Sequence, residues 1–377
     1  MINTVSAEFQ LLCHVKHPDV LSNLLTQPID WKTVLSLVDR HRVAPLLHQA
    51  LKNQPLVPDE IRQALHQRVE KNTLRAMRNL AALQTLLSEL NRLAIKTLVL
   101  KGVGLALQTY GNIGLRHAGD IDLLIDVKDL PHAEALLQQL GYQRIQPAFP
   151  LKTWQYEKIQ QLWNQFEYYH PQGQRYVDLH WRLSYNQALC DFSFAELYEQ
   201  HQIINIQPQA IPILAPLHNL LYLTAHGSQH VWGCLFWLWD INLLLQKNTF
   251  DWTHIITTAQ RVGCLRPLLQ GIVLAQHLLN SPLPTDIQVY LSKDSMITKL
   301  VNAGEQYLQL PIPLPLHHVL WQKLYYDVHL NPRWTYRRQL LRHAFLHPHD
   351  WQTMPLPKQL FLLYYLFGSV LWLKRQL

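Results

Sequence analysis

Two carboxylates occupy alternate positions of an apolar run, in the segment DIDLLIDV that begins at Asp120. Burying acidic side chains in such a run costs free energy unless cations or hydrogen bonds compensate. Because Asp120 and Asp122 are two positions apart, an extended strand directs both to the same face of a sheet. Lys101-Gly102 ends an earlier apolar run and predicts a tight turn. Paired carboxylates beside a glycine turn are typical of a magnesium–nucleotide site, and hence of phosphoryl or nucleotidyl transfer.

A third carboxylate, Asp178, occurs in the segment YVDLHW, which alternates between polar and apolar residues. An extended strand separates these residues onto two faces. The polar face carries Tyr176, Asp178, His180 and Arg182, and the inward face carries Val177, Leu179 and Trp181. We therefore expect Asp178 to face the other two carboxylates without disturbing the core.

The elements that position these residues divide the chain of 377 residues into three parts. Residues 1–94 show apolar positions three and four apart, which predicts an N-terminal helical lobe. Residues 95–185 alternate strand and helix patterns and end in a hairpin around Pro-Gln-Gly-Gln, which predicts a small mixed sheet. Residues 186–377 return to helix patterns. The fold class that we expect is α+β, a small α/β core flanked by helical regions.

The order of Lys101-Gly102, Asp120-Ile121-Asp122 and Asp178 resembles the nucleotidyltransferase superfamily typified by DNA polymerase β. More narrowly, the chain is similar to a bacterial nucleotidyltransferase-like group and, in this core, to AbiEii-type toxins. The resemblance covers about residues 95–185, with a weaker match in the helix at 215–246. It implies that Asp120, Asp122 and Asp178 hold two magnesium ions, with Asp178 also able to deprotonate the attacking hydroxyl.

The resemblance further implies that Lys101, Gly102 and Arg116 hold the triphosphate. Val103 follows Gly102 where most of the superfamily has serine or glycine, so phosphate binding would depend mainly on Lys101 and Arg116. Other interpretations stay open at this stage, because Asp122 can instead pair with Arg116 and Lys101 can be a plain surface lysine.

A second group of candidates lies in the helix that follows the core. His226 and His230 are four residues apart and share a helix face, but a third ligand for zinc is not evident. The resemblance implies that His226 and Asp240 touch the nucleotide or the acceptor. Packing of a buried histidine among tryptophans is the alternative.

The composition agrees with a phosphate-bearing partner, since the net charge is +7. The four cysteines are widely spaced and show no zinc or disulfide framework, and the N-terminal residues lack a signal-peptide pattern, so we expect a cytoplasmic protein.

Residues 360–373 are apolar but too short to span a bilayer. We expect a buried or dimer-forming helix there, with contact to a membrane surface as the alternative.

The sequence therefore predicts a magnesium-dependent enzyme that transfers a nucleoside monophosphate from a nucleoside triphosphate to a hydroxyl acceptor and releases pyrophosphate. A small molecule, a protein and RNA all remain possible acceptors. Two alternatives stay open, namely a nucleotide-binding or interaction module that has lost turnover and a toxin that modifies tRNA.

Overall fold

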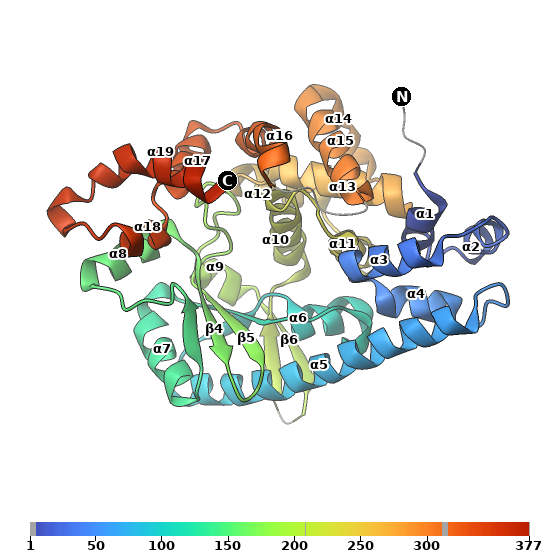
Figure 1. The fold of residues 1–377 in the computed structure, drawn as a ribbon, viewed down its shortest axis with the longest axis horizontal. Coiled ribbons are helices and arrows are strands. Elements are labelled where there is room, and N and C mark those ends of the chain that lie inside the picture. Colours follow the sequence, from blue (N-terminus) through green and yellow to red (C-terminus); the bar gives the residue numbers. More distant parts are fainter. Residues whose placement is uncertain (1–4, 208, 311–315, 377) are drawn as a thin grey trace.

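The computed structural model describes residues 5–207, 209–310 and 316–376. The N-terminal lobe is helical as predicted. Its last helix is the longest and runs along one side of the molecule (Figure 1). Asp30 caps one of these helices by accepting hydrogen bonds from two backbone amides. The helices are α1 (Ala7–Cys13), α2 (Pro18–Leu24), α3 (Trp31–His41), α4 (Ala44–Leu51) and α5 (Asp59–Arg92).

A mixed sheet of seven strands forms the centre of the chain, in the order β3-β4-β5-β2-β1-β7-β6. Neighbouring strands are antiparallel except for two parallel pairs, β2 with β5 and β1 with β7. The strands are β1 (Thr97–Val99), β2 (Ile121–Ile125), β3 (Gln143–Gln146), β4 (Gln165–His170), β5 (Arg175–His180), β6 (Gln202–Ile206) and β7 (Gln209–Ile213). This arrangement confirms the α+β class and the predicted hairpin, which is β4–β5.

The last two strands correct one expectation. Helix patterns were expected throughout residues 186–377, yet β6 and β7 form an antiparallel hairpin that pairs with β1. Ile204 and Ile206 of β6 are partly buried and alternate with exposed residues, but each strand of the hairpin has only five residues, so the two-residue period is short. The division of the chain into three domains stays a prediction.

Short helical segments connect the strands. Residues 102–110 form a helix as expected, although its second half has π-helical hydrogen bonding. The connecting elements are α6 (Gly102–Leu105), the π-helix Ala106–Tyr110, the short helices Ile113–Leu115 and Val127–Asp129, α7 (Leu130–Gln139) and α8 (Thr153–Leu162).

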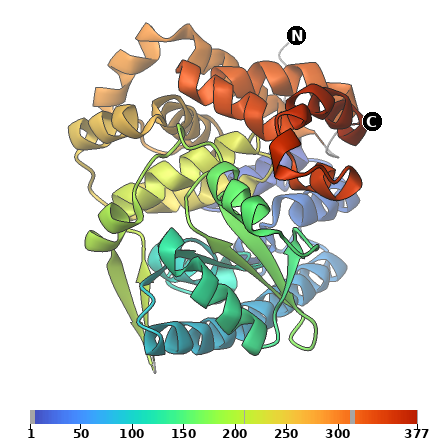
Figure 2. The same ribbon diagram turned by 90° about the vertical axis from the view of Figure 1, so that its left-hand side faces the viewer.

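Helices α10 to α15 contribute to the core on the opposite side of the sheet from α5, whereas Leu346, Trp351 and Tyr364 near the C-terminus join the core that contains α5 (Figures 1 and 2). Among these helices, α10 packs against both α11 and α13. The helices of the C-terminal half are α9 (Phe194–Glu199), α10 (Pro216–Gln229), α11 (Leu235–Lys247), α12 (Trp252–Val262), α13 (Leu265–Leu279), α14 (Thr285–Lys293), α15 (Ser295–Gln309), α16 (Leu316–His329), α17 (Trp334–Phe345), α18 (Pro348–Thr353), the short helix Lys358–Leu360 and α19 (Leu363–Gln376).

Two hydrophobic cores lie on the two faces of the sheet. Leu98 and Leu124 point into a core shared with α1–α4 and the C-terminal helices, whereas Val99 and Leu123 point into a core shared with α5 and α7. This alternation follows from the two-residue period of a strand. Helices from both ends of the chain thus pack together on one face of the sheet, where Trp239 of α11 donates a hydrogen bond to the carbonyl of Leu12 (3.3 Å).

The apolar segment near the C-terminus forms α19, which packs against α17. Tyr364 is buried, whereas Leu362 and Val370 are 73% and 69% exposed. Among the described residues, no helix combines the length and apolarity that crossing a membrane requires.

Candidate active site

Parallel pairing of β2 with β5 brings the predicted carboxylates together. Asp122 stands opposite Asp178 in the register, and Leu124 stands opposite His180. As predicted, Val177, Leu179 and Trp181 pack into the core on the far face. Asp120, which directly precedes β2, lines the same cavity as Asp122 and Asp178. The three predicted carboxylates thus line one cavity of about 390 Å³.

Three side chains of this group are close enough to share a metal ion. One ligand atom each from Asp122, Asp178 and His180 lies within 4.8 Å of the others. Asp120 lies in the same cavity but outside this set of ligand atoms. The sequence analysis placed His180 on the polar face of its strand without a metal-binding role, whereas the structure groups it with Asp122 and Asp178.

Asp122 is fully buried and its two oxygens differ in their surroundings. Oδ1 accepts from Lys101 Nζ (2.9 Å) and from His180 Nε2 (3.3 Å). Oδ2 is buried and has no hydrogen-bond partner among the described residues. A buried carboxylate oxygen without a partner is costly, and a bound cation would relieve that cost. This donor set fits a divalent metal.

The hydrogen bonds of His180 indicate how it acts on Asp122. Asn164 Nδ2 lies 3.3 Å from His180 Nδ1, which accepts its hydrogen bond when the ring is neutral. The proton then sits on Nε2 and is donated to Asp122 Oδ1. Burial also lowers the pKa of His180, which agrees with a neutral ring. His180 therefore orients Asp122 through Oδ1, and Oδ2 is left without a hydrogen-bond partner among the described residues.

The aspartates have opposite protonation tendencies. Burial raises the pKa of Asp178 to about 8, with the charges of Asp122 and Asp120 adding to the shift. The pKa of Asp120 is raised by the charge of Asp122 and by burial. Burial opposes ionisation of Asp122 as well, but the charge of Lys101 and the hydrogen bond from His180 hold its pKa below the ordinary value. The site carries more negative charge than Lys101 alone neutralises.

The backbone geometry at this site favours glycine at position 102. Its φ is +57°, which is unfavourable for other residues, and a Cβ there would lie 3.2 Å from the carbonyl oxygen of Asp120. The glycine thus lets the Lys101 turn lie directly against the start of β2. Gly104 faces the sheet, where a Cβ would lie 2.8 Å from Ile213.

Arg116 and Asp240 bind each other. Arg116 Nε and Nη2 donate to the two oxygens of Asp240 at 2.9 Å, and Tyr110 Oη donates to Oδ1 at 2.8 Å. Both members of the pair are buried. Arg116 lines the cavity, whereas Asp240 lies behind it and holds the guanidinium in place. This geometry differs from the expectation that Arg116 and Asp240 contact the nucleotide independently.

His226 lines the cavity as expected, in an aromatic group with His230 and Trp237. Its ring centroid lies 4.7 Å from that of His230 and 5.3 Å from that of Trp237. Burial and the nearby charge of Lys101 lower its pKa well below the ordinary value. His226 is therefore neutral and can contribute hydrogen bonding or stacking rather than charge.

Arg42 and Glu167 are charged residues of the cavity that sequence reasoning missed. Glu167 stands opposite Asp178 on β4, and the alternation of the hairpin contained that signal. Arg42 follows α3 with a φ of +57°, and no local pattern connects it with the carboxylates. Its charge nevertheless acts on Asp120, whose pKa it lowers in opposition to Asp122 and burial.

Comparison with known proteins identifies the family of the chain. A family model described as "Uncharacterised nucleotidyltransferase" matches residues 27–280, about two thirds of the chain. The chain therefore belongs to this nucleotidyltransferase family, and membership implies a nucleotide substrate. No curated protein matches the chain. The match includes all seven strands and every candidate site residue named above.

Proposed function

We propose that the protein is a magnesium-dependent nucleotidyltransferase of the DNA polymerase β type. It would transfer a nucleoside monophosphate from a nucleoside triphosphate to a hydroxyl acceptor and release pyrophosphate. The observation that carries the proposal is the register of Asp122 with Asp178 in the lining of a cavity, where Asp122 Oδ2 is buried and has no hydrogen-bond partner among the described residues. Carboxylate oxygens are the ligands that magnesium prefers.

In this proposal Asp122 and Asp178 hold the metal, and Asp120 completes the set from the same cavity. Bound magnesium would supply neutralising charge for the triphosphate and for the leaving pyrophosphate. The acceptor oxygen forms a bond to the α-phosphorus, and the bond from that phosphorus to the bridging oxygen breaks. Pyrophosphate leaves with the electron pair, and the acceptor proton passes to a carboxylate oxygen of Asp178.

The positions of the cations at the site support one orientation of the bound triphosphate. Lys101 and Arg116 are held by Asp122 and Asp240, so their charges are partly satisfied within the protein. Arg42 makes no ion pair with a carboxylate in the described part of the chain. It also lines an adjacent groove of about 430 Å³, together with Lys71 and Arg75. We infer that the β- and γ-phosphates lie toward Arg42 and this groove.

The test compares Asp122→Asn and Asp178→Asn with Asp126→Asn as a matched control. Asp126 caps the short helix after β2 and does not line the cavity. Calorimetry with MgATP and a pyrophosphate-release assay with a cell extract are run on each folded variant. We expect the two site variants to lose release by at least a hundredfold, about 2.7 kcal/mol, and the control to retain it. Unchanged release in either site variant would refute the assignment.

The same experiment tests the alternative that the protein is a nucleotide-binding module without enzymatic activity. If the wild-type protein binds MgATP but releases no pyrophosphate with any extract fraction, the enzymatic proposal fails and the binding module is supported.

A further inference from the structure

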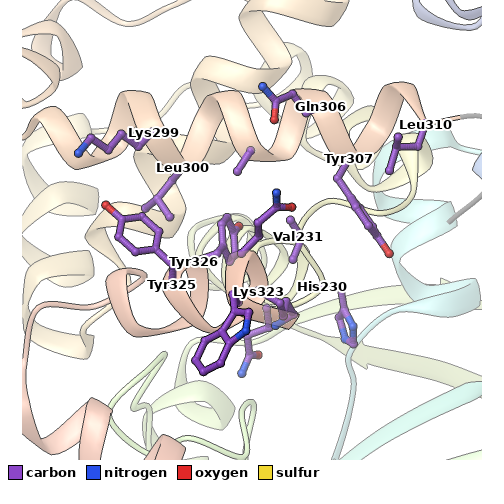
Figure 3. A pocket seen from close by; sticks show the side chains of 14 residues that line it. His230, Val231, Lys299, Leu300, Gln306, Tyr307, Leu310, Lys323, Tyr325 and Tyr326 are labelled. Atoms are coloured by element: carbon purple, nitrogen blue, oxygen red, sulfur yellow. The ribbon is translucent and has the colours of Figure 1, made fainter. Parts of the chain in front are cut away.

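A second and larger cavity, of about 780 Å³, opens beside the candidate active site. Figure 3 shows side chains from three elements around it. Leu300 and Tyr307 come from α15, Tyr325 and Tyr326 come from α16, and Val231 comes from the turn after α10. The volume lies within the range typical of sites for small molecules, which is roughly 300–1,000 Å³.

The two cavities meet at the end of α10. Gln229 and His230 line both of them. Gln229 Nε2 donates to Ser184 Oγ (3.1 Å), which also lines the catalytic cavity. The His230 ring lies 5.5 Å from that of Trp237. Gln229 and His230 therefore form the boundary between the two cavities.

The turn at this junction is strained and firmly anchored. Val231 and Trp232 have φ values of 50° and 54°, a conformation that is rare for a β-branched residue such as valine. Trp232 is fully buried, and a Cβ on Gly227 or Gly271 would lie 2.4 Å or 2.9 Å from its ring. The packing of Trp232 against these glycines holds the turn in place. Strain that is maintained in this way is common at ligand sites.

The lining of the larger cavity is aromatic and cationic. Four aromatic side chains line it, and no carboxylate does among the described residues. Lys323 forms an ion pair with Asp327, whereas Lys299 is exposed and makes no ion pair with a described carboxylate. The aromatic residues are Tyr307, Trp321, Tyr325 and Tyr326. Such a lining favours a flat ring that carries negative charge and disfavours a polycation.

We propose that this cavity is the acceptor subsite, and that the acceptor is a small hydroxyl-bearing molecule built on an aromatic ring with an anionic group. The inference rests on the proposed nucleotidyl transfer and names its acceptor class. The ring lies between α15 and α16, the anionic group lies toward Lys299, and the hydroxyl extends past Gln229 to the α-phosphorus. The bonds made and broken are those of the transfer described above.

Calorimetry on the full chain uses two matched probes, a hydroxynaphthalene carrying a sulfonate and the same ring carrying an aminomethyl group. We expect the anionic probe to bind at least about tenfold more tightly than the cationic one. Ala303→Trp fills the cavity from α15 and should abolish binding of the anionic probe, while MgATP affinity is unchanged. Asn302→Trp, at an exposed neighbouring position outside the lining, is the control and should leave both affinities unchanged.

Lys299→Glu tests the same cavity without touching the core, because Lys299 is exposed. It should remove the preference for the anionic probe, whereas Lys293→Glu, which lies outside the lining, should preserve it. Equal binding of the two probes, or probe binding that survives Ala303→Trp, overturns the proposal. The proposal is also overturned if a single-stranded RNA oligonucleotide binds more tightly than the anionic probe and Ala303→Trp blocks its binding as well. Failure of the nucleotidyltransferase proposal is distinguishable, because the wild-type protein would then not bind MgATP or would release no pyrophosphate.

Discussion

Asp122 and Asp178 stand opposite each other on neighbouring parallel strands, and among the described residues only one oxygen of Asp122 is hydrogen-bonded. Lys101 and His180 both donate to Oδ1, and Gln165 Nε2 donates to Asp178 Oδ2 at 3.0 Å. Asp122 Oδ2 therefore stays buried without a partner in the described part of the chain.

Metal binding should strengthen as the pH rises toward 8. The pKa of Asp178 is raised from 3.8 to about 8, so without a cation the folded protein keeps a proton that the unfolded chain has lost above pH 3.8. The raised pKa therefore reduces stability progressively as the pH rises from the unfolded value to the folded one. Because magnesium must displace that proton, we expect the rise in Tm on adding magnesium to be larger at about pH 9 than at about pH 6.

The control for this prediction is Asp178→Asn, in which the magnesium-dependent rise in Tm should be small at both pH values. Differential scanning fluorimetry across the pH range provides the measurement. A rise in Tm that is independent of pH in the wild-type protein would contradict the role of Asp178.

Lys101→Met should destabilise the protein in the absence of metal. The substitution leaves Asp122 buried without its cation, and breaking a buried ion pair costs about 3–5 kcal/mol. Urea denaturation measures the change, and added magnesium should recover part of it because the metal supplies the missing charge. Lys128→Met, whose side chain is 74% exposed, is the control and should change stability little. A loss no larger than that of the control would show that Asp122 does not depend on Lys101.

Arg116 and Asp240 should behave as one structural unit. Arg116→Met or Asp240→Leu alone leaves a buried charge without its partner and should cost about 3–5 kcal/mol. The double variant should be more stable than the sum of the two losses predicts, since neither charge remains. A double-mutant cycle by chemical denaturation measures this coupling. Additive losses would mean that the pair does not interact as its geometry indicates.

Arg42→Gln should weaken MgATP binding by about tenfold, roughly 1.4 kcal/mol, because it removes a cation that faces the catalytic cavity. The free energy of unfolding should change little, since Arg42 is exposed and makes no ion pair in the described chain. Isothermal titration calorimetry provides the affinity. Arg78→Gln, at an exposed position of α5 outside both cavities, should bind MgATP normally. Equal MgATP affinities of Arg42→Gln and Arg78→Gln would show that the phosphates do not lie near Arg42.

Gly102→Ala should reduce stability by about 1–2 kcal/mol, because a Cβ is unfavourable at a φ of +57° and would press on the carbonyl of Asp120. The same pressure should weaken magnesium binding, which the metal-dependent change in Tm reports. Gly119→Ala, where a Cβ would meet only the His117 ring at 3.5 Å, is the matched control. Equal magnesium responses in the two variants would refute a role for the Gly102 turn in positioning Asp120.

Local patterns predicted the parts of the site that depend on a single strand or turn. The alternation in β5 placed Asp178 and His180 on one face, and the two-residue spacing placed Asp120 with Asp122. The glycine at position 102 indicated a turn that only a residue without a Cβ forms easily. In contrast, the β6–β7 hairpin was missed, because its alternating isoleucines extend over only five residues in each strand.

The sequence by itself determined the residue types of the site and the face of the strand on which each one lies, because the two-residue period of a strand is a local property of the backbone. Only the tertiary structure decided which groups satisfy each other. Arg116 meets Asp240 across 124 residues, and the N-terminal Arg42 reaches the cavity of β2 and β5. The aromatic cavity beside α10 likewise depends on how α15 and α16 pack. Such contacts arise from the packing of whole elements, which no local spacing encodes.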